Sequence, residues 1–286
     1  MHIAVLSGKG GTGKTLVSVN LASVAEASTY IDCDVEEPNG HLFLKPEKVQ
    51  EDDVTVLIPQ VNNALCDGCR QCVSFCRFNA LAYINEQLIV LEDICHSCGG
   101  CVLICPQQAL SEKTKIIGQV QRGISERIQV TTGILKPGIP SGTPIVSQMM
   151  QNDMLEPSQL TVIDCPPGSA CIVMDSIKNA DYCVLVAEPT IFGLHNFKMV
   201  YDLVRLFKLP CGVVLNKQQA DKDPVEQFCL DNHIKILSKI PYDEELAHLS
   251  SKGQIAVKVN EKYHTLFSKL LNTIIEEAAH ETTPHS

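Results

Sequence analysis

The sequence predicts a doubly wound α/β fold, in which a mainly parallel sheet carries helices on both faces and is interrupted by a small cysteine-rich insert. Three observations lead to this prediction. A glycine-rich phosphate loop joins an N-terminal aliphatic strand to a helical pattern. Short aliphatic strands alternate with helical stretches in the second half of the chain, which is typical of parallel strands joined by right-handed crossovers. Between these parts lies a segment that holds eight of the fourteen cysteines.

The length of the chain allows two structural units. Its 286 residues suffice for one α/β domain of about 200–230 residues and an insert of about 50. We expect residues 1–58 to form the first part of the α/β domain, residues 59–112 the insert, and residues 113–286 the second part.

The charge and hydropathy exclude several classes of partner. A net charge of −10 argues against a nucleic-acid surface and against binding to anionic lipid. No run of apolar residues reaches the length of a membrane span, and no secretory leader pattern precedes the first strand. We therefore expect a cytoplasmic protein that neither binds nucleic acid nor inserts into a membrane.

The phosphate loop reads Gly-Lys-Gly-Gly-Thr-Gly-Lys-Thr and lies between a strand at residues 3–6 and a helix at residues 16–26. Glycines let the backbone turn tightly and aim its N–H groups at phosphate oxygens, and the helix N-terminus adds its positive dipole end. The lysine before the helix is expected to bind the β- and γ-phosphates, and the threonine hydroxyl to bind Mg²⁺. The predicted nucleotide-binding residues of this loop are Gly8, Lys9, Gly10, Gly11, Thr12, Gly13, Lys14 and Thr15.

The chain after residue 112 supplies most strands of the predicted sheet. The strand candidates are short and aliphatic, at residues 160–164, 182–187, 211–216 and 236–240. Helical patterns lie between and after them, at residues 195–207, 224–233 and 261–279. Residues 113–157 carry no such pattern, and their glycines and prolines favour loops, at Gly133, Pro137, Gly138, Pro140 and Gly142.

Polar side chains follow several of these strands, at the edge where doubly wound sheets bind ligands. Asp34 ends the segment Tyr-Ile-Asp-Cys-Asp, and Asp164 lies in Val-Ile-Asp-Cys-Pro-Pro-Gly, which closes at Gly168. Asn216 and Lys217 follow another strand, and Pro241 follows the next. A phosphate loop needs carboxylates to hold Mg²⁺ and to place water, so the two aspartates are the candidates for those roles.

The insert holds two runs of four cysteines with the spacing C-x₂-C-x₂-C-x₃-C, and each cysteine of the second run lies 29 residues after its counterpart. This internal repeat predicts two similar halves packed about a pseudo-twofold axis. The spacing is typical of two-cluster ferredoxins, whereas zinc sites usually show two C-x₂-C pairs separated by a longer loop. The predicted ligands are Cys66, Cys69, Cys72 and Cys76, followed by Cys95, Cys98, Cys101 and Cys105.

With these motifs, the whole chain resembles the MinD/ParA and nitrogenase-iron-protein superfamily of P-loop ATPases, in the group with an inserted two-[4Fe–4S] ferredoxin domain. This resemblance implies an ATP-sandwich homodimer in which Lys9 reaches the partner's nucleotide. It implies that Asp34 orients the attacking water and that Asp164 binds Mg²⁺ through water. The other residues that it places around the nucleotide are Asp32, Asn39, Gly168, Asn216, Lys217 and Pro241.

The ferredoxin resemblance also implies how the cysteines divide. By that pattern Cys66, Cys69, Cys72 and Cys105 hold one cluster, whereas Cys95, Cys98, Cys101 and Cys76 hold the other. The first run departs from the pattern at one position, because Arg77 stands where a proline is usual.

Three functions remain open on the sequence. The first is an ATPase that couples ATP hydrolysis, with Mg²⁺, to electron transfer through the two clusters toward an unidentified redox partner protein. The second is an iron–sulfur carrier or assembly ATPase. The lack of a C-x-x-C pair outside the insert counts against this function. The third is a MinD-like positioning or cell-division ATPase. Cys165 precedes Gly168 and Cys171 follows it. These two cysteines are either structural thiols or a sensor of nucleotide.

Overall fold

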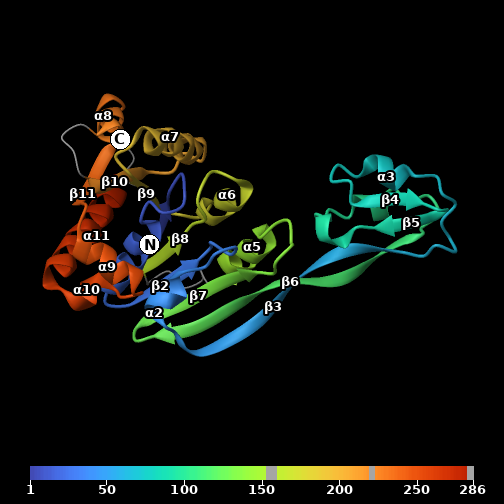
Figure 1. Ribbon diagram of the computed structural model, residues 1–286, viewed down its shortest axis with the longest axis horizontal. Helices are drawn as coiled ribbons and strands as arrows, with labels where there is room; N and C mark the ends of the chain where they lie inside the picture. The colour runs from blue at the N-terminus through green and yellow to red at the C-terminus, as the bar shows by residue number, and fades with distance from the viewer. Residues whose placement is uncertain (153–159, 219–222, 282–286) are drawn as a thin grey trace.

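The computed structural model describes residues 1–152, 160–218 and 223–281. They form a large α/β body, from which a long two-stranded ribbon carries a small lobe away from the rest of the chain (Figure 1). We call residues 62–109 the small lobe; it joins the body through the two strands of that ribbon. No helix in the described ranges combines the length and the apolar character that crossing a membrane requires.

The body is built on one nine-stranded sheet. Its central strands are parallel, which confirms the predicted mainly parallel α/β fold, and its last two strands run antiparallel and form the ribbon. The strand order is β11 (Lys235–Pro241), β10 (Cys211–Gln218), β9 (Tyr182–Ala187), β1 (His2–Leu6), β8 (Leu160–Asp164), β2 (Ser28–Asp32), β7 (Ile128–Leu135), β6 (Leu110–Ser125) and β3 (Glu47–Val61).

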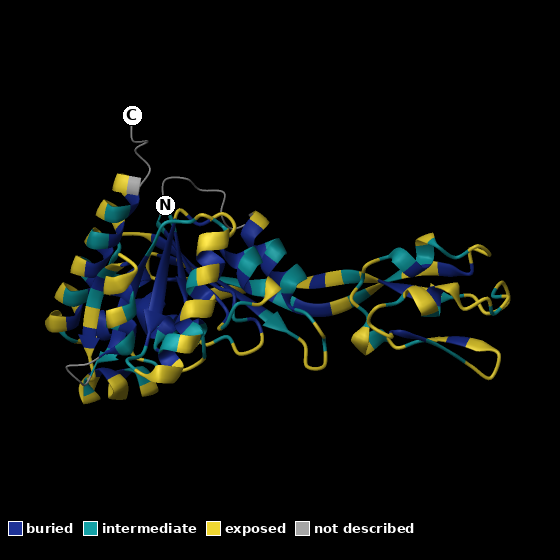
Figure 2. Ribbon diagram, turned by 90° about the horizontal axis from the view of Figure 1, so that it is seen from above, coloured by how far each residue is buried: buried dark blue, intermediate teal, exposed yellow. Residues whose placement is uncertain are grey.

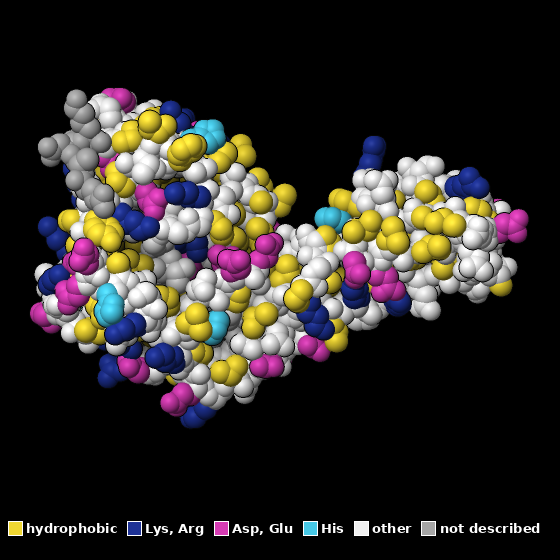
Figure 3. Space-filling model, viewed as in Figure 1, with side chains coloured by type: hydrophobic (Ala, Val, Ile, Leu, Met, Phe, Trp, Pro, Cys, Tyr) yellow, Lys and Arg dark blue, Asp and Glu magenta, His cyan; other side chains and the backbone are white. Residues whose placement is uncertain are grey.

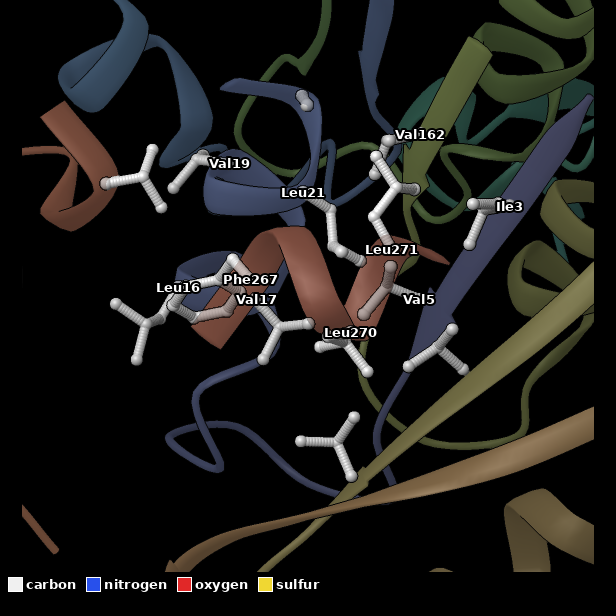
Figure 4. Packing of buried hydrophobic residues seen from close by; sticks show 14 of the residues in the cluster. Ile3, Val5, Leu16, Val17, Val19, Leu21, Val162, Phe267, Leu270 and Leu271 are labelled. Carbon is white, nitrogen blue, oxygen red and sulfur yellow. The ribbon is translucent and has the colours of Figure 1, made fainter. Parts of the chain in front are cut away.

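Two hydrophobic cores lie on opposite faces of this sheet, because successive residues of each strand point to opposite sides. In β1, Ile3 and Val5 belong to one core, whereas Ala4 and Leu6 belong to the other. The first core packs under α1 (Lys14–Val24), α2 (Gly40–Leu44), α9 (Glu244–Ser251), α10 (Ala256–Val259) and α11 (Glu261–Glu281), and Figure 4 shows its packing from close by. The second packs under α5 (Thr143–Asn152), α6 (Cys171–Ile177), α7 (Ile191–Leu206) and α8 (Pro224–Asp231).

The expectation of loops across residues 113–157 is wrong for most of that segment. Strands β6 and β7 and helix α5 occupy it up to residue 152, and residues 153–157 lie outside the described part of the chain. Gly133 lies inside β7, where a Cβ atom would sit 2.6 Å from Met149 Sδ of α5. The glycine therefore marks a close approach between helix and strand, which also occurs within regular strands. Pro137, Gly138 and Pro140 do lie in the connection between β7 and α5.

The small lobe contains little regular structure. Strands β4 (Leu81–Ile84) and β5 (Gln87–Val90) form a hairpin, and the short helices are α3 (Gln71–Phe75), η1 (Glu92–Ile94) and α4 (Gly100–Leu103). Most of its residues are exposed or half-buried, in contrast to the buried sheet of the body (Figure 2). Hydrophobic side chains gather on the face of the lobe that is seen in Figure 3. Its small core combines leucines with cysteine side chains, so the lobe has few apolar contacts of its own to stabilise it.

Candidate functional site

The phosphate loop leaves its backbone open to one large cleft. Helix α1 begins at Lys14, directly after Gly13, whose φ of 96° is costly for any side chain. A Cβ atom on Gly13 would also lie 2.2 Å from Asn216 Nδ2, so only glycine fits there. At Gly10 and Gly11 a Cβ atom would meet nothing within 4 Å, and both residues line the cleft. The loop thus presents accessible backbone where a phosphate group would bind.

Behind the loop, Lys14 begins a buried chain of polar contacts. Its Nζ lies 2.5 Å from Asp164 Oδ1, and the Tyr30 hydroxyl donates to Asp164 Oδ2 at 2.8 Å. Burial acts to lower the pKa of Lys14, but the ion pair with Asp164 outweighs it and raises that pKa above its usual value. Burial of Tyr30 and the negative charge of Asp164 raise the pKa of Tyr30 well above its usual value. Lys14 therefore stays cationic and Tyr30 stays a hydrogen-bond donor.

Two further carboxylates follow strand β2. Asp32 is buried and accepts three backbone N–H groups, from Asp34 at 3.2 Å, Asn39 at 3.1 Å and Gly40 at 2.9 Å. Asp34 instead lines the cleft. Burial raises the pKa of Asp34 to about 6, partly offset by the charge of Lys14, whereas burial and the negative charge of Asp164 raise the pKa of Asp32 to about 7. Asp32 shapes the loop, and Asp34 is the carboxylate presented to a ligand.

The end of strand β10 holds the phosphate loop from the other side. Asn216 is buried and donates from Nδ2 to the Thr12 carbonyl oxygen at 2.7 Å. Lys217 Nζ donates to the Gly11 carbonyl oxygen at 2.6 Å. Both residues therefore position the loop backbone, which is a role that the sequence pattern did not indicate. The Thr12 hydroxyl is buried without a hydrogen-bond partner among the described residues, so the loop retains an unused polar atom.

Glu188 is the functional candidate that sequence reasoning missed. Its carboxylate binds Lys9 Nζ at 2.6 Å and Lys217 Nζ at 2.7 Å. Burial acts to raise the pKa of Glu188, but the hydrogen bonds from the two lysines lower it below its usual value. Glu188 directly follows strand β9, so the rule that selected Asp34 and Asp164, a carboxylate at the end of an aliphatic strand, would have found it.

The cleft has a volume of about 1040 Å³ and brings together most of the predicted nucleotide-binding residues. Those that line it are Gly10, Gly11, Gly13, Lys14, Thr15, Asp34, Asn39, Asn216, Lys217 and Pro241. The predicted residues that do not line it are Gly8, Lys9, Thr12, Asp32, Asp164 and Gly168. Its size suits a nucleotide, since small-molecule sites usually measure about 300–1,000 Å³.

Two of the predicted glycines lie beside the cleft in constrained positions. A Cβ atom on Gly8 would lie 2.2 Å from the Asn196 carbonyl oxygen of α7, so Gly8 serves packing between loop and helix. Gly168 has a φ of 91°, and its N–H donates to the Ser7 carbonyl oxygen at 2.9 Å. That N–H must leave Ser7 before it can bind a phosphate oxygen.

In the small lobe the eight cysteines of the insert line two separate cavities. Cys66, Cys69, Cys72 and Cys105 surround one of them, and we call this set the first thiol site. The second thiol site consists of Cys76, Cys95, Cys98 and Cys101. Each site takes three thiols from one run of the sequence and the last thiol from the other run. Within the described residues, no three His, Cys, Asp or Glu side chains are arranged to hold a metal ion.

Backbone N–H groups point at several of these sulfur atoms. Ala80 donates to Cys76 Sγ at 3.3 Å, and Ala109 donates to Cys105 Sγ at the same distance. Ala109 lies 29 residues after Ala80, so the two contacts are related by the internal repeat. Hydrogen bonds of this kind stabilise negative charge on sulfur.

The other cysteines divide by burial. Cys165 is fully buried, and burial, with some contribution from the neighbouring Cys33 thiol, raises its pKa well above the usual value. Such a thiol is inert, because the thiolate is the reactive form. Cys171 is exposed at the start of α6. The two positions flanking Gly168 therefore have different chemistry.

Comparison with known proteins identifies relatives of the whole chain. The model of the CobQ/CobB/MinD/ParA nucleotide binding domain matches residues 3–257. The uncharacterized protein MJ0579 of Methanocaldococcus jannaschii is 28% identical over 271 residues, which cover 91% of this chain and 93% of that protein.

Solved structures that match the chain over nearly its full length include two MinD proteins. The cell division ATPase MinD of Pyrococcus furiosus has a TM-score of 0.58 at 20% identity, covering 96% of this chain and 98% of its own. The septum site-determining protein MinD of Pyrococcus horikoshii, complexed with Mg-ADP, has a TM-score of 0.54 at 18% identity. The match covers 99% of this chain and 96% of that one. At these identities the two matches show a common fold.

Proposed function

Since the chain belongs to the CobQ/CobB/MinD/ParA nucleotide-binding domain family, we propose that it binds and hydrolyses Mg-ATP in the cleft and couples this reaction to electron transfer through two [4Fe–4S] clusters in the small lobe. One observation carries the proposal. A phosphate loop that opens into a nucleotide-sized cleft shares the chain with two cavities, each lined by four cysteines. We assign the insert to residues 59–112 and the ATPase domain to residues 1–58 and 113–286.

The cleft has the groups that ATP hydrolysis needs. The open backbone at Gly10 and Gly11 and the cationic Lys14 bind the phosphates, and the Thr15 hydroxyl binds Mg²⁺. If the phosphates drew Lys14 toward them, Asp164 Oδ1 would be released from this contact and could help Thr15 to hold Mg²⁺, which would neutralise charge on the phosphates. Asp34 lies in the cleft lining and orients the water that attacks the γ-phosphate in line with the leaving oxygen.

The active unit that we propose is a homodimer with ATP between two copies. Lys9 lies at the edge of the loop, its side chain 38% exposed and bound to Glu188 of its own subunit. From there it can reach across to the nucleotide of a second copy and stabilise the charge that develops on the phosphates. Asn216, Lys217 and Pro241 also line the cleft, and we propose that they bind the base of the nucleotide.

Four thiols around one cavity are the ligand set of a [4Fe–4S] cluster, which supports the proposal, although no three of them within the described residues are arranged to hold a single metal ion. Each site offers four thiols around a cavity and backbone N–H groups aimed at sulfur, and the Leu81, Leu88 and Leu110 side chains form a small apolar core beside them. A cluster bound in such a site accepts and releases one electron. The protein's contribution is to hold the thiols, to exclude water and to set the charge around each site.

A continuous segment of chain connects the two parts. Asp32 fixes the loop that carries Asp34, because its carboxylate binds the N–H groups of Asn39 and Gly40. Helix α2 begins at Gly40 and leads into β3, which runs along the ribbon to the small lobe. The other ribbon strand holds the lobe through Lys113, whose Nζ binds Glu92 at 2.6 Å. Along this path, we propose, a shift of the Asp34 loop during hydrolysis reaches the small lobe through β3.

The proposal is tested with protein prepared without oxygen. We expect about eight iron and eight sulfide per chain, and ATP hydrolysis that Lys14→Ala abolishes. For the coupling, the dithionite-reduced protein is mixed with an excess of oxidised methyl viologen, with Mg-ATP or with a non-hydrolysable analogue. Faster electron transfer with Mg-ATP, absent in Lys14→Ala, supports coupling. Protein without iron and sulfide, or an equal rate in all cases, refutes it.

A positioning function is the second candidate, because full-length matches include the cell division ATPase MinD. In that case the small lobe only recognises a partner, and the clusters stabilise it. Replacement of Cys98 by Ser distinguishes the two functions. A positioning ATPase keeps its cellular localisation after losing the second cluster, whereas an electron-transfer protein loses its redox activity. Rapid transfer of iron and sulfide to an acceptor protein would instead indicate a cluster carrier.

A further inference from the structure

The two thiol sites have matching ligands and matching exposure. The repeat of 29 residues relates Cys66, Cys69 and Cys72 to the first three cysteines of the second run. Cys72 and its counterpart Cys101 are each 7% exposed, while Cys69 and Cys98 are both exposed. Each cavity is also lined by one arginine. Ligand type, burial and cationic side chains therefore do not distinguish the sites.

The side chains between the ligands do distinguish them. At the first thiol site, Gln107 Nε2 donates to Asp67 Oδ2 at 3.1 Å, and Asp67 Oδ1 accepts the Cys69 N–H at 3.1 Å. Both Asp67 and Gln107 line the cavity. The first site thus has a carboxylate held beside its ligands.

The second thiol site replaces this polar pair by an aromatic one. His96 and Phe78 are the residues that the repeat relates to Asp67 and Gln107, and both line the second cavity. Their rings stack, with centroids 3.7 Å apart and planes 16° from parallel. An imidazole carries no negative charge at neutral pH, and no carboxylate is among the lining residues of this cavity. Glu112 Oε1 would lie 3.2 Å from a Cβ atom on Gly99, but Glu112 itself does not line the cavity.

The two sites also differ in the hydrogen bonds that backbone N–H groups donate to sulfur, and the second site again has the features that favour an added electron. The contacts from Ala80 and Ala109 are matched between the sites. The second site has one more, from the Ser97 N–H to Cys95 Sγ at 3.5 Å. Within the described parts of the chain, no backbone N–H makes the corresponding contact to Cys66. A donor aimed at sulfur stabilises the added electron, whereas a nearby carboxylate opposes it.

From these differences we propose that the two sites are functionally unequal: the cluster at the second thiol site has the higher reduction potential and holds the electron when the protein is reduced by one electron. Asp67 and Gln107 lower the potential of the first site, and Phe78, His96 and the Ser97 N–H raise that of the second. The proposal rests on the proposed function, because it requires both clusters to be present.

The experiment is a redox titration of the iron-loaded protein, followed by electron paramagnetic resonance, on wild type and two variants. Wild type is expected to show two midpoint potentials. Asp67→Asn removes the carboxylate charge with little change in shape and should raise the lower midpoint only. The double variant Phe78→Gln, His96→Asp gives the second site the chemistry of the first and should lower the higher midpoint.

Glu86→Gln is the matched control. It removes one negative charge from the turn between β4 and β5, and Glu86 lines neither cavity, so both midpoints should stay in place. A single midpoint in fully loaded wild type, a rise of the higher midpoint in Asp67→Asn, or an unchanged higher midpoint in the double variant overturns the inference. Protein that contains no iron and sulfide overturns the proposed function itself, and the two failures are therefore distinguishable.

Discussion

Lys9 Nζ lies 2.6 Å from a carboxylate oxygen of Glu188, within one subunit. The same carboxylate binds Lys217, which also donates to the Gly11 carbonyl oxygen. Glu188 therefore ties the early lysine of the phosphate loop to the loop's own backbone. In the proposed dimer, Lys9 has to leave this contact before it reaches the partner's nucleotide.

Loss of the Glu188 charge should make dimerisation easier. We expect Glu188→Gln to tighten the dimer formed with a non-hydrolysable ATP analogue about two- to fivefold, because a partly exposed ion pair contributes on the order of 1 kcal/mol or less. Analytical ultracentrifugation measures the dissociation constant, and the difference should shrink at high salt. Glu277→Gln is the matched control, since it breaks a pair of the same 2.6 Å length between Glu277 of helix α11 and Lys235 of strand β11. A weaker dimer in Glu188→Gln would contradict the prediction.

A second prediction concerns the buried pair of Lys14 and Asp164, whose side chains are 7% and 1% exposed. Lys14→Ala leaves the Asp164 carboxylate buried without its counter-ion, so we expect the free energy of unfolding to fall by about 3 kcal/mol or more. Adding Asp164→Asn removes the charge and keeps an oxygen for the Tyr30 hydroxyl. The double variant should recover at least about half of the loss.

Urea denaturation without nucleotide measures the free energy of unfolding of the Lys14→Ala variant and of the double variant with Asp164→Asn. Ser18→Ala serves as the control for changes in α1, because it removes a hydrogen bond from the Ser18 hydroxyl to the Lys14 carbonyl oxygen and leaves the ion pair in place. Its cost should stay at about 1 kcal/mol, the usual net contribution of one hydrogen bond. Equal stability of the single and double variants would show that the ion pair is not what stabilises this region.

The site shows where local sequence patterns are sufficient and where they are not. The phosphate loop and the two cysteine runs are each contiguous in the sequence, so a local pattern is sufficient to find them. Glu188 and the loop-holding role of Asn216 depend on strands β9 and β10 lying beside β1 in space. The pattern around Gly133 is misleading for the same reason, because its need for a glycine comes from Met149 on α5. Long-range packing of this kind leaves no local periodicity in the sequence.

The pH dependence of hydrolysis follows from Asp34. Burial raises its pKa to about 6, and the ionised carboxylate is the form that accepts a hydrogen bond from the attacking water. The rate should therefore be constant above about pH 7 and fall roughly tenfold per pH unit below about pH 6. Steady-state hydrolysis at saturating Mg-ATP measures the profile, with nucleotide binding recorded at each pH. Asp34→Asn should be slow and flat over this range, and a variant that keeps the wild-type profile would remove Asp34 from this role.

The exchange of ligands between the two cysteine runs gives the sharpest test of the small lobe. Cys105 lies with Cys66 at the first thiol site. The other three cysteines of its run belong to the second thiol site. The double variant Cys66→Ser, Cys105→Ser should therefore lose one cluster and keep about four iron atoms per chain, whereas Cys95→Ser, Cys105→Ser should lose both. Iron analysis of anaerobic protein decides between them, and Cys229→Ser, a buried cysteine of α8 outside the lobe, should keep the full content. If each run bound its own cluster, the two double variants would show the opposite result, since Cys95 and Cys105 would then belong to the same site.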